Sequence, residues 1–256
     1  MPELEIRQIP VLRDNYVYLA RDPETGACAA VDPAVAPPVL VMLDRLGWQL
    51  SHILCTHHHY DHVGGNLELK RATGCTIVGH RADAHRIPGI DVMVSEGDEI
   101  ALGSQVARVL DVSGHTRGHI AYWFPGSHAA FVGDTLFALG CGRLFEGTPA
   151  EMWRSLCKLR ELPADTRIYC GHEYTESNAA FALAVDPDNA ELVARAERVR
   201  ALRRAGQPTV PSLLGEERAT NPFLRADDAA LQRSIGHPGT DPVAAFADLR
   251  QRKDSF

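Results

Sequence analysis

Four side chains that can bind metal ions lie within six residues of one another in this sequence: His57, His59, Asp61 and His62. They directly follow a short apolar run over residues 51–55. Histidine and aspartate are poor core fillers, so such a cluster requires a compensating partner, and imidazole nitrogen and carboxylate oxygen are ligands that zinc, iron and manganese accept. The spacing H-x-H-x-D-H therefore predicts a metal site, in which the first pair serves one ion and the second pair turns toward a neighbouring ion.

Further ligands are expected at the ends of other strands, beside small residues that let the backbone approach an ion. His115 follows an apolar run over residues 106–110, Asp134 follows the run 129–132, and His172 follows the run 167–170. A catalytic ion needs about three protein ligands and an open position for water. Together with the His57–His62 cluster, these residues predict a catalytic metal centre.

The elements that must position these ligands are short strands with interleaved helices. Apolar runs bounded by Asp, Pro and Gly predict strands over residues 16–19, 28–31, 52–55, 76–78, 106–110, 119–124, 129–132 and 167–170. Helical patterns occupy residues 38–46, 64–73 and 149–162. This mixture is typical of a layered α/β or α+β domain.

The pattern changes after about residue 174. Helices are predicted over residues 175–185 and 189–205, followed by a Pro/Gly-rich connection and a last helix over about 241–253. In the second of these helices we expect the arginines to form a solvent-exposed face, namely Arg195, Arg198 and Arg203. The chain is thus expected to comprise a metal-binding domain over residues 1–174 and a small helical domain over residues 175–256.

Composition narrows the possible functions. The 256 residues carry a net charge of −7, and nucleic-acid binders normally show a basic excess. No apolar stretch approaches the roughly 20 residues of a membrane span, and the N-terminus lacks the basic and apolar regions of a signal peptide. The six cysteines lack C-x-x-C spacing, as is typical of reduced thiols in a cytosolic protein. We expect a cytoplasmic monomer that binds neither nucleic acid nor membranes.

At this point the chain resembles the metallo-β-lactamase superfamily and, within it, the glyoxalase II enzymes, also called hydroxyacylglutathione hydrolases. The resemblance covers nearly the whole chain, and its motifs occupy residues 9–16, 56–66, 114–119, 133–137, 140–143, 170–175, 221–225 and 250–256. The first metal motif is common to the superfamily. The C-terminal motifs are much narrower and indicate the glyoxalase II family.

The resemblance implies an αββα sandwich for the first domain and a specific assignment of the metal ligands. One ion would be bound by His57, His59 and His115, and the other by Asp61, His62 and His172. Asp134 would bridge the two ions. His58 and His119 match family positions that are not ligands, and Asp32 is expected to orient the site.

The implied activity is hydrolysis of the thioester S-D-lactoylglutathione to D-lactate and glutathione, the second step of methylglyoxal detoxification. A hydroxide bridging two divalent metals would be the nucleophile, because metal binding lowers the pKa of water to about 7. Zinc is the first candidate, with iron or manganese also compatible. Asp61 and Asp134 are the expected catalytic residues, since both would bind metal and Asp61 could orient the water.

Four residues match the family's glutathione-contacting positions: Arg143, Tyr174, Arg250 and Lys253. Some family members have Lys and Tyr where this chain has Arg143 and Phe145. Arginine keeps the positive charge, whereas phenylalanine cannot supply a hydroxyl donor. The resemblance therefore implies a glutathione thioester substrate, with altered contacts at these two positions.

Three alternative functions remain open. A persulfide dioxygenase on the same scaffold would use a single iron, but the full second ligand set and the C-terminal Arg250 and Lys253 argue against it. A metal-dependent ribonuclease shares the H-x-H-x-D-H motif, but this chain has an acidic balance and no basic arm. A non-enzymatic binding module would normally have lost ligands.

Overall fold

The computed structural model describes residues 2–256 and divides into two compact units. The first, here called the N-terminal unit, comprises Met1–Asp111 and Arg117–Gly133. The second, the C-terminal unit, comprises Val112–Thr116 and Asp134–Phe256. The short segment that carries His115 therefore belongs to the C-terminal unit.

The first sheet of the N-terminal unit has six strands in sequence order. They are β1 (Glu5–Val11), β2 (Asn15–Arg21), β3 (Cys28–Val31), β4 (Leu50–Leu54), β5 (Thr76–His80) and β6 (Val92–Val94). Strands β1 to β3 are antiparallel, and β3 to β6 are parallel. Parallel strands need crossover connections, which α1 (Pro37–Leu46) and α3 (Asn66–Thr73) provide.

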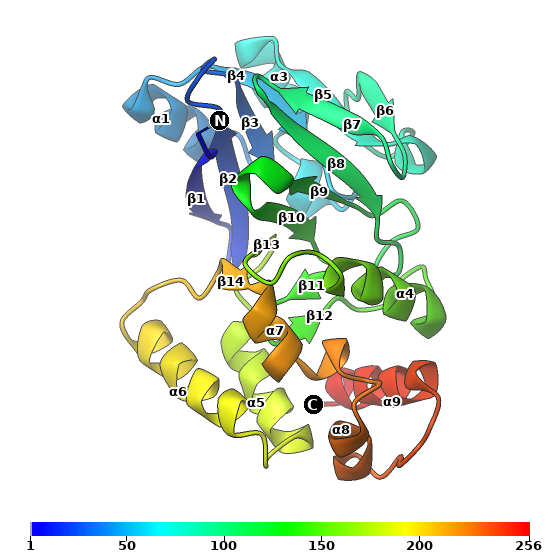
Figure 1. Ribbon diagram of the computed structural model, residues 1–256. Coiled ribbons are helices and arrows are strands. Elements are labelled where there is room, and N and C mark those ends of the chain that lie inside the picture. Colours follow the sequence, from blue (N-terminus) through cyan, green and yellow to red (C-terminus); the bar gives the residue numbers. More distant parts are fainter. Residues whose placement is uncertain (1) are drawn as a thin grey trace. The chain divides into compact units, whose positions relative to one another are not determined.

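One face of this sheet is covered by α1 and α3 (Figure 1). Val39 and Leu43 of α1 and Leu69 of α3 pack in one buried cluster with side chains of the strands, such as Leu19 and Ile53. Alternate residues of a strand point to opposite faces, so the same strands can also contribute to a second buried layer.

The second layer consists of β7 (Glu99–Leu102), β8 (Gln105–Asp111), β9 (Ile120–Phe124) and β10 (Ala129–Gly133), which pair antiparallel with their neighbours. The ring of Tyr18 on β2 lies 5.7 Å from that of Phe131 on β10. The hydroxyl of Tyr122 on β9 donates to the carbonyl of Cys55, which directly follows β4. The unit therefore has two facing sheets, with α1 and α3 on the outer face of the first. Three short elements, α2 (Tyr60–Val63), η1 (Arg81–Asp83) and η2 (Pro125–Ser127), lie in its loops.

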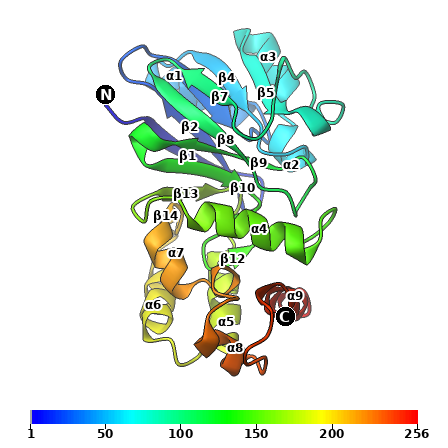
Figure 2. The ribbon, with the colours of Figure 1, turned by 45° about the vertical axis from the view of Figure 1, so that its right-hand side comes forward.

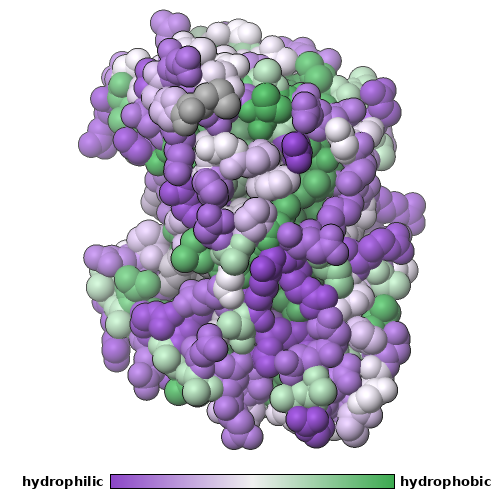
Figure 3. Space-filling view, in the orientation of Figure 1, coloured by the Kyte–Doolittle hydropathy of each residue, from purple (hydrophilic) through white to green (hydrophobic). Residues whose placement is uncertain are grey.

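The C-terminal unit is mainly helical. Its helices are α4 (Pro149–Arg160), α5 (Thr175–Val185), α6 (Ala190–Arg204), α7 (Leu214–Thr220), η3 (Pro222–Leu224), α8 (Ala229–Ser234) and α9 (Pro242–Asp254). Two antiparallel pairs complete it: β11 (Leu136–Phe137) with β12 (Gly140–Cys141), and β13 (Arg167–Cys170) with β14 (Ser212–Leu213). Helices α5 and α6 lie side by side (Figures 1 and 2) around a small apolar cluster. Hydrophilic residues dominate the face of this unit seen in Figure 3.

Every strand and helix predicted from the sequence is present, and the α/β class with a helical C-terminal region is confirmed. Two expectations were wrong. The supposed connection between α6 and α9 contains β14, α7, η3 and α8. Arg195 is not on a solvent-exposed face: it is 3% exposed and ion-paired with Glu217 of α7. Among the helices within residues 2–256, none is both long and apolar enough to cross a membrane.

Candidate metal centre

The N-terminal ligand set comprises His57 and His59, in the loop after β4, and Asp61 and His62, in the short helix α2. His57 and His62 are almost completely buried. The Nε2 atom of His57 lies 3.1 Å from Nδ1 of His59. Two nitrogens bound at about 2.0–2.1 Å to one tetrahedral ion would be about 3.3 Å apart, so this pair fits a shared ion. A second pair is formed by Nε2 of His62 and Oδ2 of Asp61, 3.6 Å apart.

Asp32 orients two of these imidazoles. Its Oδ1 and Oδ2 atoms accept hydrogen bonds from the backbone N–H (2.7 Å) and the hydroxyl (2.6 Å) of Thr56. The Thr56 oxygen is then the acceptor for Nδ1 of His57 at 3.0 Å, and Asp32 Oδ2 lies 3.1 Å from Nδ1 of His62. When Nδ1–H donates to an oxygen, Nε2 is left as the metal-binding nitrogen. These contacts agree with the expected orienting role of Asp32.

Three further side chains, none of them an expected ligand, contact this set. Asn15, at the start of β2, donates from Nδ2 to the backbone oxygen (3.1 Å) and Oδ2 (3.0 Å) of Asp61. The ring of His119 stacks on that of His57, with centroids 4.6 Å apart. His58 points to the buried carboxylate of Asp83, 3.0 Å from its Nδ1. Asn15 belongs to a motif shared with the family, which was the only sequence signal for it.

The C-terminal ligand set, His115, Asp134 and His172, is assembled from three separate loops of the C-terminal unit. All three residues are buried. Oδ2 of Asp134 lies 3.5 Å from Nε2 of His115 and 3.3 Å from Nε2 of His172. A single carboxylate oxygen thus faces both imidazoles, which is the arrangement that a bridging ligand requires.

The backbone orients His115. Its Nδ1 is 2.9 Å from the carbonyl oxygen of Arg143, so Nδ1–H donates there and Nε2 faces Asp134. The backbone at Gly142 passes so close to Asp134 and His115 that only a residue without a Cβ atom fits there. A Cβ atom on Gly142 would lie 1.9 Å from the carbonyl oxygen of Asp134 and 3.2 Å from Nδ1 of His115.

Aromatic rings enclose His172. Its imidazole stacks on Tyr174, with centroids 4.7 Å apart and ring planes within 4° of parallel. The ring of Phe137 meets the same imidazole edge-on at 6.0 Å. Phe145 lies edge-on to His115 at 5.1 Å and is 61% exposed. Tyr174 and Phe145 therefore each contact the imidazole of an expected metal ligand and are also exposed to solvent.

Three cations of the C-terminal unit are close enough to influence one another. Burial lowers the pKa of Lys253, and the charges of Arg250 and Arg143 lower it further. Nζ of Lys253 donates to the hydroxyl and carbonyl oxygens of Ser177, at 3.0 and 3.2 Å. A lysine whose protonated form is disfavoured by neighbouring cations gains from an anionic ligand.

Arg250 is less accessible than the sequence suggests. The side chain is 7% exposed, and its guanidinium donates to the carbonyl oxygen of Cys141 at 2.9 Å and to Asp254 at 2.9 Å. It also lies over the ring of Phe223, 5.2 Å from the centroid. Arg250 thus has structural contacts of its own, and its predicted contact with glutathione stays a prediction.

The expected ligands lie in these two sets, one in each unit, and both sets consist of donors that divalent metal ions accept. The chain as a whole has known relatives. Residues 11–172 match the metallo-beta-lactamase superfamily, which defines the class of the fold. Residues 173–256 match the family described as hydroxyacylglutathione hydrolase C-terminus.

The hydroxyacylglutathione hydrolase of Methylococcus capsulatus is 62% identical over 253 residues, which cover 99% of each chain. This chain therefore belongs to the hydroxyacylglutathione hydrolase family. Among solved structures, ETHE1 from Myxococcus xanthus is similar with a TM-score of 0.71 and 26% identity, over 96% of this chain and 90% of that one. TTHA1623, solved in a di-iron-bound form, has a TM-score of 0.61 and 25% identity, over 85% of this chain and 98% of that one.

Proposed function

We propose that this protein hydrolyses S-D-lactoylglutathione to D-lactate and glutathione with two divalent metal ions bound by the N-terminal and C-terminal ligand sets. The observation that carries the proposal is a complete set of expected ligands in a chain that matches hydroxyacylglutathione hydrolases from end to end. A protein that only bound a ligand would not need so many buried imidazoles and carboxylates facing one another.

The proposed ligands of the first ion are His57, His59 and His115. The proposed ligands of the second ion are Asp61, His62 and His172, with Asp134 between the two. The short separation of His57 Nε2 and His59 Nδ1, and the position of Asp134 Oδ2 between two imidazoles, support this division. Zinc suits such nitrogen and oxygen ligands, and the di-iron form of the related TTHA1623 makes iron the second candidate.

When bound, such ions make water nucleophilic near neutral pH and polarise a thioester carbonyl. The chain's own residues orient the reactants. Asn15 fixes the Asp61 carboxylate by donating to it, and Asp61 would then orient the attacking water. No residue needs to protonate the leaving group, because a thiol has a pKa of about 8.5 and leaves as the thiolate.

The glutathione part of the substrate carries two carboxylates, which cations would recognise. We propose that Arg143, Lys253 and Tyr174 contact it, and that Arg250 contributes through its charge beside Cys141. The lowered pKa of Lys253 supports an anion site here. A glutathione site in the helical region also accounts for a C-terminal family pattern that is specific to these hydrolases.

We further propose a domain boundary near residue 174, a monomeric state and a cytoplasmic location. The two family patterns meet at residues 172 and 173, which supports the boundary. Free thiols at all six cysteines are typical of a reducing compartment.

The direct test is an assay on protein of known metal content. Hydrolysis of lactoylglutathione, followed as loss of the thioester, is compared with oxygen uptake in the presence of glutathione persulfide. We expect rapid thioester hydrolysis and no oxygen uptake. Oxygen uptake without thioester hydrolysis would favour the dioxygenase, and neither activity in fully metal-loaded protein would contradict the proposal.

A further inference from the structure

The tight turn between β11 and β12 contains a residue in an unusual conformation. Phe137 and Gly140 pair across the hairpin, so Ala138 and Leu139 form its two-residue turn. Leu139 has a φ of +59°, in the left-handed region that a branched side chain rarely adopts. Such a conformation persists only where surrounding contacts enforce it. Contacts around this turn must therefore hold Leu139 in its left-handed conformation.

Both ends of the peptide unit between Ala138 and Leu139 are hydrogen-bonded. The carbonyl oxygen of Ala138 accepts from Nδ2 of Asn178 on α5 at 3.1 Å. The N–H of Leu139 donates to Oε2 of Glu217 on α7 at 2.9 Å. Rotation of this peptide would break both bonds, so the two side chains fix its orientation.

The strands of the hairpin are fixed by a third side chain. Nδ2 of Asn221 donates to the carbonyl oxygens of Phe137 (3.1 Å) and Gly140 (3.0 Å), and it also lies 3.1 Å from Oε2 of Glu217. We call Asn178, Glu217 and Asn221 the turn clamp. All three are buried.

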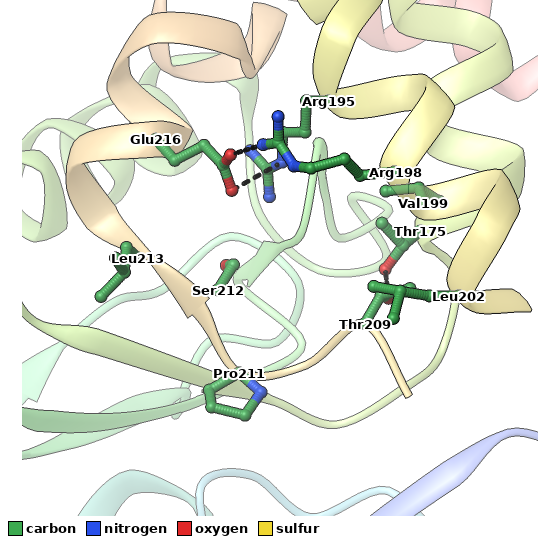
Figure 4. A pocket seen from close by; sticks show the side chains of 10 residues that line it. All are labelled: Thr175, Arg195, Arg198, Val199, Leu202, Thr209, Pro211, Ser212, Leu213 and Glu216. Carbon is green, nitrogen blue, oxygen red and sulfur yellow. Dashed lines mark hydrogen bonds and ion pairs between the residues drawn. The ribbon is translucent and has the colours of Figure 1, made fainter. Parts of the chain in front are cut away.

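The clamp is itself anchored in the helical region. Glu217 is fully buried and forms an ion pair with Arg195 of α6, which is also buried. Arg195 contacts Glu216 as well, and Figure 4 shows the Glu216 carboxylate facing the guanidinium groups of both Arg195 and Arg198. Burial opposes the charge of Arg195, but Glu217 and Glu216 raise its pKa above the ordinary value, so it stays charged. The side chain of Leu139 packs in the apolar cluster between α5 and α6.

The hairpin connects directly to the C-terminal ligand set. Asp134 precedes β11 by two positions, and the N–H of Gly142, just after β12, donates to the carbonyl oxygen of Thr135. The next residue, Arg143, supplies the carbonyl oxygen that accepts from His115. A shift of the hairpin would therefore move Asp134 and the hydrogen-bond acceptor of His115 together.

We propose that Glu217, Asn178 and Asn221 are positioning residues of the metal centre, which act by fixing the β11–β12 turn and through it the geometry of Asp134 and His115. The inference rests on the proposed metal centre. It assigns to the helical region a second role besides substrate binding: α5, α6 and α7 determine how well the C-terminal ligand set contributes to metal binding.

The test compares three variants of the full chain. Glu217→Gln has the same shape, but one of the two carboxylate oxygens becomes an NH2 group. That group must face either Arg195 or the N–H donors of Leu139 and Asn221, so one of these contacts is lost. Asn221→Asp has the same shape but cannot donate to Phe137 and Gly140. The matched control is Asp186→Asn, which removes another buried carboxylate of the same unit, paired with Arg225 and without any hydrogen bond to the hairpin in the described structure.

For each variant, zinc affinity is measured by competition with a chromophoric chelator, and thermal unfolding of the metal-free protein is followed separately. We expect Glu217→Gln and Asn221→Asp to weaken zinc binding about ten- to a hundredfold, as for residues that orient metal ligands. We expect Asp186→Asn to lower thermal stability comparably while zinc affinity stays within about twofold, since ligand geometry is untouched. Saturating zinc should restore much of the lost kcat in the two clamp variants.

Wild-type zinc affinity in both clamp variants, or an equal loss in Asp186→Asn, would overturn the proposal. If Glu217→Gln does not fold, Asn178→Ser provides the same test, because it removes only the bond to Ala138; about two- to tenfold weaker zinc binding is expected for one net hydrogen bond. Zinc affinity is measured without substrate. A failure to hydrolyse lactoylglutathione would therefore contradict the proposed function and leave the clamp to be judged by zinc binding alone.

Discussion

The two ligand sets are built in contrasting ways. The N-terminal set occupies one continuous segment between β4 and α3, and its imidazoles are oriented mainly by Thr56, within that segment, and by Asp32 at the end of β3. The C-terminal set comes from three separate loops, with His115 oriented by a backbone carbonyl and Asp134 leading into a turn fixed by three helices. One set is specified by short-range spacing and the other by tertiary packing.

This difference predicts how each set responds to change. Substitutions within the segment from 56 to 62 should act on the N-terminal set directly, whereas the C-terminal set should also respond to substitutions in helices far along the chain. Dispersed ligands depend on the packing of every element that carries them, because interiors are close-packed and transmit small displacements.

The sharpest test of the continuous segment compares adjacent histidines. His59→Ala should lose a ligand and lower zinc affinity more than about a hundredfold, beyond the range for residues that only orient ligands. His58→Ala should retain bound zinc, because the His58 ring points to Asp83. Zinc content after dialysis and the rate of lactoylglutathione hydrolysis measure both. Equal zinc loss in the two variants would mean that the ligand register is wrong.

Asp32 tests whether orientation within the N-terminal set matters. Asp32→Asn keeps the shape of the side chain but replaces one oxygen by an NH2 group, although Thr56 and His62 both donate to this carboxylate. Zinc affinity should therefore fall about tenfold or more. Chelator competition measures the effect.

The matched control for Asp32→Asn is Asp22→Asn, a carboxylate of the same unit. Burial raises the pKa of Asp22, but hydrogen bonds from Ser104, Thr25 and Glu24 outweigh it and lower the pKa to about 2. Asp22 therefore stabilises the fold above the unfolded-state pKa of about 3.9, and this contribution is lost as pH falls toward 2. Asp22→Asn should remove that pH dependence and leave zinc affinity unchanged. A comparable zinc loss in both variants would assign the effect of Asp32 to general destabilisation.

Binding of the glutathione moiety should depend on residues of the C-terminal unit. Lys253→Ala should lower kcat/KM for lactoylglutathione about tenfold, mostly through KM, the low end for a charge-assisted bond that is partly screened by solvent. Because burial and two neighbouring arginines lower the pKa of Lys253, KM should begin to rise at a lower pH than for an ordinary lysine. Lys253→Arg, which stays charged, should abolish this alkaline rise. An unchanged KM in Lys253→Ala would exclude the contact.

The smallest expected effect is at Phe145, an exposed ring beside His115. Phe145→Tyr adds the hydroxyl that some family members have, and we expect KM for lactoylglutathione to fall about twofold, the low end for a neutral hydrogen bond. Zinc affinity should not change. A rise in KM would show that this position does not face the glutathione moiety.

The sequence was sufficient to predict the principal strands and to single out the side chains of the two proposed ligand sets, because apolar runs and the H-x-H-x-D-H spacing are local signals. Some elements were missed: β6 has three residues, of which Val92 and Met93 are exposed, and β1 contains Pro10. Neither shows the alternation of a half-buried strand clearly.

The orienting contacts could not be predicted in the same way. Asn15 and Asp61 are 46 positions apart, and Leu139 and Glu217 are 78 apart, so only the folded chain brings them together. Arg195 was assigned to solvent because α7, which buries it, lies in a segment whose Pro and Gly content resembles a loop. A buried ion pair leaves no periodic signal, since its residues are those of a solvated surface.

If both ligand sets bind metal, as we propose, the metal content of the protein will show it. Protein stripped of metal, reloaded with zinc and freed of excess should contain close to two ions per chain by elemental analysis. His172→Ala, which removes a proposed ligand of the second ion only, should contain close to one. A firm value of one in the wild-type protein, unchanged when metal is added during the assay, would contradict the binding of two ions.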